Sequence, residues 1–468
     1  MKISIVTVFP ELYTQFFTTS ILGRAIEKNL IEFNLVRLSD FVKPKERIDE
    51  PTCGPGPGMI IKPDVLERAL MACEEKWGTG YRIFFSPQGV TLNQNILKDL
   101  AQQIAPERKL VFKQDCPQAS EFAQDASQGS GENKVSGQKQ IEHLVLVCSR
   151  YEGIDERVLQ KHADLELSIG DYVLFGGDLP AQVLIEGLSR LISHVVGTQE
   201  SVECESFSGA FLDHPQYGLP VEWHGKNIPE VVLSGNHAKI EQWRKQEACR
   251  KTVLNRFDWF RSSQPNKQDV QLATSIIPHH YVAVMHTQVL MKDGSVGQTS
   301  VASLDIHDIA RSAKAYGFKN FFVVSPLVDQ QEILKAFLSF WRSPEGIDYN
   351  KSRHDAVELV VLVKKLDEVL ENIYKLEGKK PIIIATSAKQ TERAAVIDYY
   401  SQAIVWKHER PVLFLFGTGW GLCDEVLVQC DYILTPVNGM TDYNHLSVRA
   451  AASIIFDRWL GLQPRKRA

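Results

Sequence analysis

The amino-acid sequence predicts an α/β protein with two mainly parallel sheets and a small helical region between them. Short apolar runs alternate with amphipathic helices over residues 1–197, and the alternation restarts at residue 276 and continues to residue 468. Such alternation is typical of parallel sheets that helices cover on both faces. A chain of 468 residues is also too long for one ordinary domain.

Five strands and two long helices are predicted in the first α/β region. The strands are expected at 3–9, 35–38, 81–85, 144–148 and 165–169, and the helices at 64–76 and 181–192. Pro180 suits the first turn of the second helix. The polar tract DASQGSGENKVSGQKQ cannot bury enough apolar surface to order itself, so it marks an insertion over about 113–141.

The region between the sheets is predicted to hold two linkers and a helical segment. The pattern lapses at 198–208, a helix-rich piece follows at 209–261, and a polar linker is expected at 262–275. From Trp223 to Arg261 there are eight Lys or Arg against four acids, although the formal net charge of the chain is −5. Such a segment either neutralises phosphates or forms a solvated helical face, and charge alone does not decide between them.

The second α/β region, 276–468, is expected to contain six strands. They lie at 281–286, 321–325, 357–363, 382–386, 412–416 and 432–435, with helices at 305–316 and 331–341. No apolar run reaches the roughly 18 residues of a membrane span. Eight cysteines without a CxxC pair predict reduced thiols and neither a disulfide frame nor a metal site. We therefore expect a cytoplasmic protein without membrane association.

A weak internal repeat connects the two regions. In each, an apolar strand ends in a glycine-bearing loop, CSRYEGIDERV at 148–158 and FGTGWGLCDEV at 416–426. Loops at the carboxyl ends of parallel strands are where α/β proteins bind ligands. Spacing alone does not distinguish this repeat from two unrelated strand-loop-helix units. A dinucleotide-binding interpretation of FGTGWG is weak, because the loop opens no N-terminal βαβ unit.

The longer motifs resemble known families. Residues 1 to about 261 resemble bacterial tRNA (guanine-N1)-methyltransferases of the SPOUT superfamily through ISIVTVFPE, GPGPGM, SPQG, SRYEGIDERV, SIGDYVLFGGDLPA and LSGNHAKIEQWR. Residues 276–468 resemble a second SPOUT-type family of predicted RNA methyltransferases through SLDIHDIARSAKAYG, FGTGWGL and DYNHLSVRAA. The resemblance implies two trefoil-knotted domains, S-adenosylmethionine as the methyl donor, and a homodimer in which two subunits complete each site.

The resemblance also indicates the residues that bind the donor. A bent nucleoside against crossing loops needs close backbone approach, which glycine allows, and apolar neighbours. In the first domain the expected residues are Ser86, Pro87, Gln88, Ser149, Tyr151, Glu152, Gly153, Ile169, Gly170, Asp171, Tyr172, Val173, Leu174, Gly176, Gly177 and Pro180. In the second domain they are Gly417, Gly419, Gly421, Leu434 and Pro436.

Methylation of guanine N1 needs a carboxylate that removes the N1 proton and a cation near O6. The family places these on an Asp of the interdomain linker and an Arg of the helix after the knot, which correspond to Glu205 and Arg190. Glu205 stands where the family has Asp, so its longer side chain must be repositioned. Glu203 and Asp213 are the alternative bases.

The helical segment would bind tRNA, with Asp213, His237 and Arg244 as contacts, and the modified base would be guanine at position 37 beside the anticodon. Asn444 and Arg449 are the substrate-binding candidates of the second domain, whose RNA target the sequence does not indicate. The alternative is a single-activity tRNA enzyme whose C-terminal half is a non-catalytic RNA-binding or dimerisation module.

Overall fold

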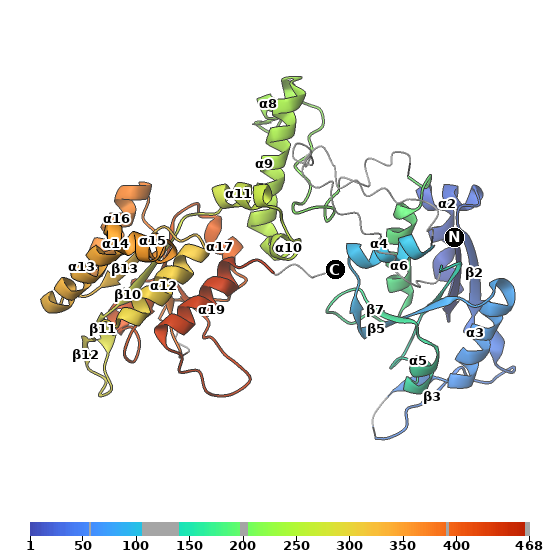
Figure 1. Cartoon of the computed structure of the whole chain (residues 1–468). Coiled ribbons are helices and arrows are strands. Elements are labelled where there is room, and N and C mark those ends of the chain that lie inside the picture. Colours follow the sequence, from blue (N-terminus) through green and yellow to red (C-terminus); the bar gives the residue numbers. More distant parts are fainter. Residues whose placement is uncertain (56–57, 105–139, 197–204, 390–392, 464–468) are drawn as a thin grey trace. The chain divides into compact units, whose positions relative to one another are not determined.

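The computed structural model describes residues 1–55, 58–104, 140–196, 205–389 and 393–463. The chain divides into two compact units, Met1–Ser208 and Gly209–Ala468, and each is an α/β structure around a parallel sheet (Figure 1). The predicted α/β class with two parallel sheets is therefore confirmed. Most of the insertion expected at 113–141 and of the linker expected at 198–208 lies outside the described residues.

The first unit is built on a five-stranded sheet with the order β2-β1-β6-β5-β7. Its strands are β1 (Lys2–Thr7), β2 (Glu32–Arg37), β5 (Tyr81–Thr91), β6 (His143–Val147) and β7 (Leu165–Ser168). All of their pairings are parallel, and all five strands agree with the prediction. β5 extends beyond its predicted end because, after a register shift between Phe85 and Val90, it pairs with β7 again.

Helices cover both faces of this sheet. Ile5 and Val6 belong to different buried clusters, because successive strand residues point to opposite faces. On one face pack α2 (Ser20–Glu27), α4 (Gln94–Ile104) and α6 (Asp178–Leu191), and on the other α3 (Pro63–Trp77) and α5 (Glu156–His162). The remaining elements are α1 (Thr14–Thr18), the 3-10 turns Pro10–Tyr13 and Leu38–Phe41, and the hairpin β3 (Asp49–Pro51) and β4 (Met59–Ile61).

The second unit contains a seven-stranded parallel sheet with the order β14-β13-β10-β17-β15-β18-β16. Its strands are β10 (His280–Met285), β13 (Phe321–Val324), β14 (Val360–Val363), β15 (Ile382–Thr386), β16 (Ala395–Ile397), β17 (Val412–Gly417) and β18 (Tyr432–Leu434). The six predicted strands are confirmed, with β14 shorter than expected because α15 (Lys351–Val357) occupies its predicted start. β16 has only three residues and was not predicted from the sequence.

The two sheets share one topology. The central strands β13-β10-β17-β15-β18 repeat the order β2-β1-β6-β5-β7, strand for strand along the chain. In both, the strand before the glycine-bearing loop leads through a short helix, α5 or α18 (Asp424–Leu427), to the last of these strands. A long helix then follows, α6 in the first unit and α19 (Val448–Leu460) in the second. The internal repeat expected from the two loops is thus present in the fold.

The remaining elements of the second unit precede or connect these strands. They are α8 (Glu230–Leu233), α9 (His237–Asn255), α10 (Phe257–Ser262), α11 (Lys267–Ile276), α12 (Ser303–Ala315), α13 (Val328–Arg342), α14 (Pro344–Tyr349), α16 (Leu366–Glu377), α17 (Gln402–Trp406), and the hairpins of β8 (Glu222–Trp223) with β9 (Lys226–Asn227) and of β11 (Thr287–Leu290) with β12 (Val296–Gln298). The two helices predicted at 305–316 and 331–341 correspond to α12 and α13.

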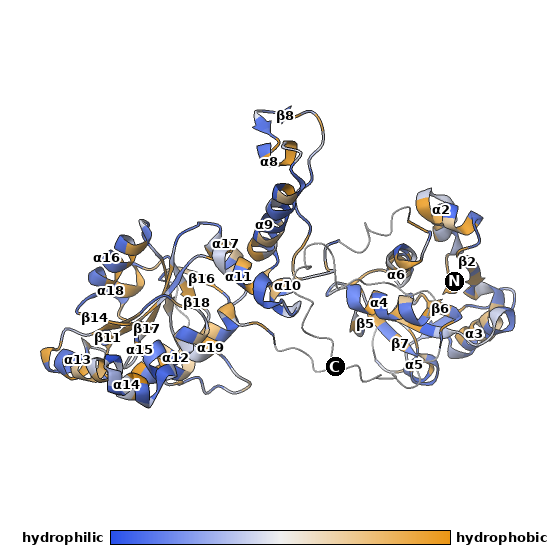
Figure 2. Cartoon of the chain, turned by 45° about the horizontal axis from the view of Figure 1, so that its top comes forward, coloured by the Kyte–Doolittle hydropathy of each residue, from blue (hydrophilic) through white to orange (hydrophobic). Residues whose placement is uncertain are grey.

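The helical segment before the second sheet shares its core. Val253 and Phe257 lie in one buried cluster with Phe414 and Trp406, and the Phe257 ring meets Trp406 edge-on at 4.8 Å. Arg261 donates to the backbone carbonyls of three residues at the end of α19. Figure 2 shows α9 as mainly hydrophilic, with hydrophobic residues near α10. The segment 209–261 therefore forms one compact unit with the second α/β region.

Much of the polar stretch 262–275 is helical rather than an extended linker. α11 begins after Asn266, whose side chain accepts a hydrogen bond from the backbone N–H of Asp269 at 2.9 Å. Ala273 is buried against the second core, and Val270 and Ile276 pack beside it. A cap and one apolar face are enough to hold a short helix on a core.

No helix among the described residues is long and apolar enough to cross a membrane. The six cysteines in the described ranges are free thiols, and no group of His, Cys, Asp or Glu there is arranged to hold a metal ion.

Candidate active sites

A cavity of about 240 Å³ lies in the first unit, at the carboxyl ends of β5, β6 and β7. The loops after β6 and β7 form most of its wall, and the first turn of α6 closes it. All predicted donor-binding residues of this unit line the cavity except Gln88 and Asp171. The structure adds Phe85, Arg150, Leu167, Ser168 and Phe175. Arg150 could have been predicted as a lining residue from the sequence, because it lies within the SRYEG motif.

The two main loops touch backbone to backbone. Gly177 donates its N–H to the Ser149 carbonyl oxygen at 2.9 Å, and Arg150 and Gly176 form an isolated antiparallel bridge. A Cβ on Gly176 would lie 2.6 Å from the Ser149 oxygen, and one on Gly177 would lie 2.9 Å from Cys148 Cα. Both contacts are too short for a side chain, so this crossing requires glycine.

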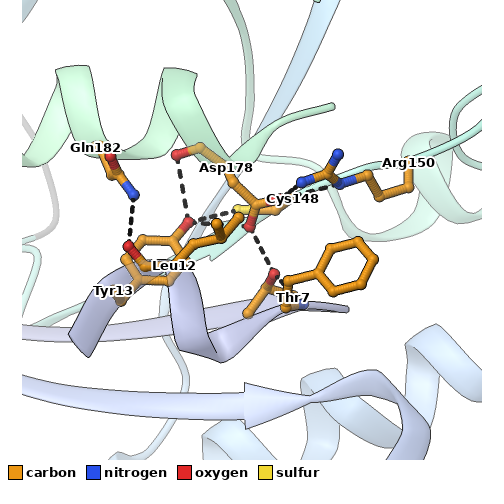
Figure 3. Close-up of polar contacts among 8 residues, drawn as sticks. Thr7, Leu12, Tyr13, Cys148, Arg150, Asp178 and Gln182 are labelled. Carbon is orange, nitrogen blue, oxygen red and sulfur yellow. Dashed lines mark hydrogen bonds and ion pairs between the residues drawn. The ribbon is translucent and has the colours of Figure 1, made fainter. Parts of the chain in front are cut away.

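Asp178 lies at the centre of a group of polar contacts with Thr7, Tyr13 and Arg150 (Figure 3). One carboxylate oxygen accepts from Thr7 Oγ1 at 2.6 Å and from the Tyr13 hydroxyl at 3.2 Å. The other accepts from Arg150 at 3.1 Å (Nε) and 2.7 Å (Nη2). Burial raises the pKa of the Tyr13 hydroxyl and of the Cys148 thiol, so both stay protonated at neutral pH. The buried carboxylate thus joins β1, α6 and the loop after β6.

The two predicted catalytic residues of the first unit lie together. Arg190, in the last turn of α6, forms an ion pair with Glu205 through Nη2 and Oε1. Neither residue lines the cavity. Glu203, one alternative base, lies outside the described residues, and Asp213, the other, is an exposed residue of the second unit.

A larger cavity of about 680 Å³ lies in the second unit, at the carboxyl ends of β10, β15, β17 and β18. Gly417, Gly419, Gly421 and Asn444 line it as predicted. Leu434 and Pro436 do not line it, whereas Thr435 and Val437 do. Leu434 is buried in the core below, because residues of an extended segment alternate in direction.

The glycine-bearing loop of this cavity is pinned to β11. Trp420 N–H donates to the Leu290 carbonyl at 2.9 Å, and Leu290 N–H donates to the Gly421 carbonyl at 2.9 Å. Gly419 and Gly421 have φ values of +60° and +106°, which favour glycine. A Cβ on Gly419 would also lie 2.8 Å from the Leu290 oxygen.

A chain of polar groups missed by the sequence analysis lines the floor of the second cavity. His286 Nδ1 lies 3.1 Å from Thr299 Oγ1, which lies 2.5 Å from Thr418 Oγ1, and Thr418 donates to the Met285 carbonyl at 2.8 Å. Burial lowers the pKa of His286 to about 4, against the opposing effect of the Asp305 carboxylate, so the imidazole is neutral at pH 7. His286 could have been predicted as a site residue, because it stands at the carboxyl end of a predicted strand.

Arg449, a predicted substrate contact, does not line the second cavity. Its Nη1 lies 2.9 Å from Asp305 Oδ1, and its Nε lies 3.6 Å from Asp308 Oδ2. Asp305 does line the cavity, so Arg449 is connected to the cavity wall through this ion pair.

Two of the three predicted RNA contacts of the helical segment, His237 and Arg244, lie on the half of α9 that has no buried residue, whereas Asp213 precedes this helix. His237 is its first residue, after the capping Asn236, and Arg244 pairs with Glu241 at 2.7 Å. The buried residues of α9 are all between Ala248 and Val253. Some basic residues of this segment form ion pairs within the second unit, since Arg250 pairs with Glu409 at 2.6 Å.

Both cavities lie at the carboxyl edge of a parallel sheet and are lined by glycine-bearing loops. This arrangement is typical of α/β enzymes that bind nucleotides. Residues 1–114 and 115–262 match the family model described as tRNA (Guanine-1)-methyltransferase TrmD. Residues 279–461 match the model described as SAM-dependent RNA methyltransferase.

Similar proteins span either one unit or both. The tRNA (guanine-N(1)-)-methyltransferase of Nitratidesulfovibrio vulgaris is 34% identical over 467 residues, which are 98% of this chain and 99% of the relative. The protein of the same name from Oleidesulfovibrio alaskensis is 32% identical with the same coverage. The one from Thermosipho africanus is 37% identical over 270 residues, which are 58% of this chain and 94% of the relative.

The chain therefore belongs to the tRNA (guanine-1)-methyltransferase family. It is a tRNA guanine-N1 methyltransferase with an additional domain that matches the SAM-dependent RNA methyltransferase family, and S-adenosylmethionine is the methyl donor of both families. The residues of the first cavity fit this donor, because Gly153, Gly170, Gly176 and Gly177 allow close backbone approach and Ile169 and Leu174 supply apolar side chains.

Proposed function

We propose that the first unit methylates N1 of guanine at position 37 of tRNA, with the donor bound in the cavity between the loops after β6 and β7. The observation that carries this proposal is the convergence of those loops. Residues 85–87, 149–153 and 167–177 are three separate segments of the chain, yet nearly all the residues expected to bind the donor line one cavity. The trefoil knot implied by the family belongs to the same proposal, and the close backbone crossing at Gly176 and Gly177 supports it.

Glu205 is the proposed base and Arg190 the proposed cation. When bound, S-adenosylmethionine supplies a methyl group on a positively charged sulfur. Glu205 accepts the N1 proton of guanine as N1 takes the methyl group, and the Arg190 guanidinium stabilises negative charge at O6. Their ion pair supports these roles, because it holds a carboxylate and a guanidinium together, as a guanine N1–O6 edge requires.

A homodimer would complete this site. Val173 and Phe175 line the cavity but are 85% and 96% exposed. Apolar side chains held this far into solvent favour a covering partner. Since Arg190 and Glu205 do not line the cavity of their own chain, a second copy that covers Val173 and Phe175 would bring its own pair to the donor.

The first test is single-turnover methylation of tRNA by Glu205→Gln. We expect unchanged binding of S-adenosylmethionine and a rate at least about 100-fold lower, because the amide cannot accept the N1 proton. Glu186→Gln, on an exposed position of α6, is the matched control. A transcript with adenine at position 37 should accept no methyl group. A near-normal rate in Glu205→Gln would overturn the assignment of the base.

We also propose that the second unit binds S-adenosylmethionine in the larger cavity and methylates an RNA. The glycine-bearing loop and the repeated topology support this, and a non-catalytic RNA-binding or dimerisation module is the alternative. In a Glu205→Gln background, methyl transfer to total RNA reports this unit. Residual transfer should disappear in Glu205→Gln/Gly419→Val, because the added side chain meets the Leu290 oxygen. No residual transfer in Glu205→Gln would favour the alternative.

A further inference from the structure

An exposed indole stands at the second cavity. Trp420 lines the cavity, and its side chain is 54% exposed. Its backbone is held on both sides, by the hydrogen bonds to Leu290 and by the left-handed conformations of Gly419 and Gly421. The loop is therefore built to present this ring, although burying an aromatic side chain of this size is strongly favourable. An exposed ring on a backbone held in this way offers its face to another planar group.

A cation and a second aromatic group lie around the same cavity. Lys389 Nζ lies 5.9 Å from the centre of the Trp420 ring, and both residues line the cavity. The loop of Lys389 is joined to the loop before α19 by a hydrogen bond from Asn444 Nδ2 to the Ala388 carbonyl at 2.6 Å. On that loop His445 lines the cavity, and the ring of Tyr443, 71% exposed, lies edge-on to it at 5.8 Å.

Aromatic rings beside a lysine are the chemistry that recognises unpaired nucleotides. Bases that are not paired stack on aromatic side chains, and lysine contacts the adjoining phosphate. A paired base has both faces covered by its neighbours and offers no face to Trp420. We propose that Trp420 is the stacking platform for an unpaired nucleobase of the RNA methylated by the second unit, with Lys389 on a phosphate of the same strand. This rests on the proposed function of that unit and names its substrate class.

The donor adenine is the competing occupant of the indole. The adenine of the donor could instead pack against other apolar side chains, since Val437, Leu446 and Ile455 line the cavity. Trp420 instead has half of its surface in solvent and a lysine beside it, which suits a group on an anionic strand. Donor binding and RNA binding must therefore be measured separately.

The test uses the full chain, wild type and Trp420→Ala. The RNA probe is an unstructured oligoribonucleotide that contains 2-aminopurine, offered single-stranded and as a duplex at one salt concentration. We expect Trp420→Ala to lose about tenfold in affinity for the single strand, and to lose the quenching of 2-aminopurine by stacking. Trp420→Phe should retain part of both. Tyr349→Ala removes another highly exposed ring of the second unit, on α14, and should change nothing.

Equilibrium dialysis with S-adenosylmethionine separates the outcomes. Binding of two donors per chain by Trp420→Ala, with wild-type affinities, together with weakened RNA binding supports the stacking role. Loss of one donor site with RNA affinity unchanged would overturn the stacking role and show that the Trp420 indole contacts S-adenosylmethionine. Unchanged RNA affinity and quenching in Trp420→Ala, or equal binding of duplex and single strand by the wild type, would also overturn it. One donor per wild-type chain would instead refute the proposed function of the second unit.

Discussion

Asp178 accepts two hydrogen bonds from the Arg150 guanidinium, at 3.1 and 2.7 Å, and so ties the loop after β6 to the first turn of α6. The carboxylate is buried, and the Arg150 side chain is 20% exposed. The same carboxylate accepts from Thr7 and Tyr13. The shape of the first donor site therefore depends on one buried charge that contacts no predicted catalytic residue.

Asp178→Asn should destabilise the first unit and weaken donor binding there. The amide leaves Arg150 without its anionic partner, and losing one member of a buried ion pair costs about 3 kcal/mol. Urea unfolding and S-adenosylmethionine affinity would measure both effects. Asp99→Asn, at an exposed position of α4, is the control. If Asp178→Asn has the free energy of unfolding and the S-adenosylmethionine affinity of the wild type, the Asp178 carboxylate does not hold the loop.

Gly177→Ala should weaken donor binding in the first unit. The added Cβ would lie 2.9 Å from Cys148 Cα, a backbone atom that cannot turn aside, so the two crossing loops must separate. Calorimetric titration with S-adenosylmethionine would show the loss at one site per chain. Gly218→Ala, where a Cβ meets nothing within 4 Å, should bind normally. Equal affinities in the two variants would mean that the crossing does not shape the site.

The second unit should lose stability as the pH falls below about 6.5. Burial lowers the pKa of His280 to about 3 and that of His286 to about 4, whereas an unfolded histidine titrates near 6.5. Between these values the unfolded chain binds more protons than the folded chain, so the stability present above pH 6.5 is lost on acidification. From pH 7 to pH 5 each histidine should cost about 2 kcal/mol in free energy of unfolding.

Urea unfolding at the two pH values checks this. His286→Asn cannot take up the proton, so its pH effect should be about 2 kcal/mol smaller than that of the wild type. His408→Asn, at an exposed position, should keep the full effect. The same pH effect in His286→Asn and in the wild type would show that His286 is already protonated in the folded chain near pH 5.

A fragment that starts at residue 209 should be more stable than one that starts at 276. The shorter fragment lacks Val253, Phe257 and Phe260, which are buried in one cluster with the second sheet. Each such side chain contributes roughly 1.5–3 kcal/mol when buried, so we expect a loss of at least about 3 kcal/mol. Urea unfolding of both fragments measures the difference. Equal free energies of unfolding would show that 209–275 is a separate domain.

Eleven of the twelve strands of the two parallel sheets could be predicted because each is a short apolar run between polar turns, and the donor loops because their glycines stand in long ordered motifs. α11 could not, since its composition is that of a linker and only contact with the second core gives its apolar face a role. His286, Thr299 and Thr418 come from three segments. Their meeting depends on which strands are neighbours, β10 and β17, and no local pattern records that order.

The number of S-adenosylmethionine molecules bound per chain shows whether both units hold a methyl donor. Equilibrium dialysis of the wild type should give two per chain, and Gly177→Val and Gly419→Val should each retain one. The double variant should bind none. A single molecule bound per wild-type chain, lost entirely in Gly177→Val and unchanged in Gly419→Val, would contradict a donor site in the second unit.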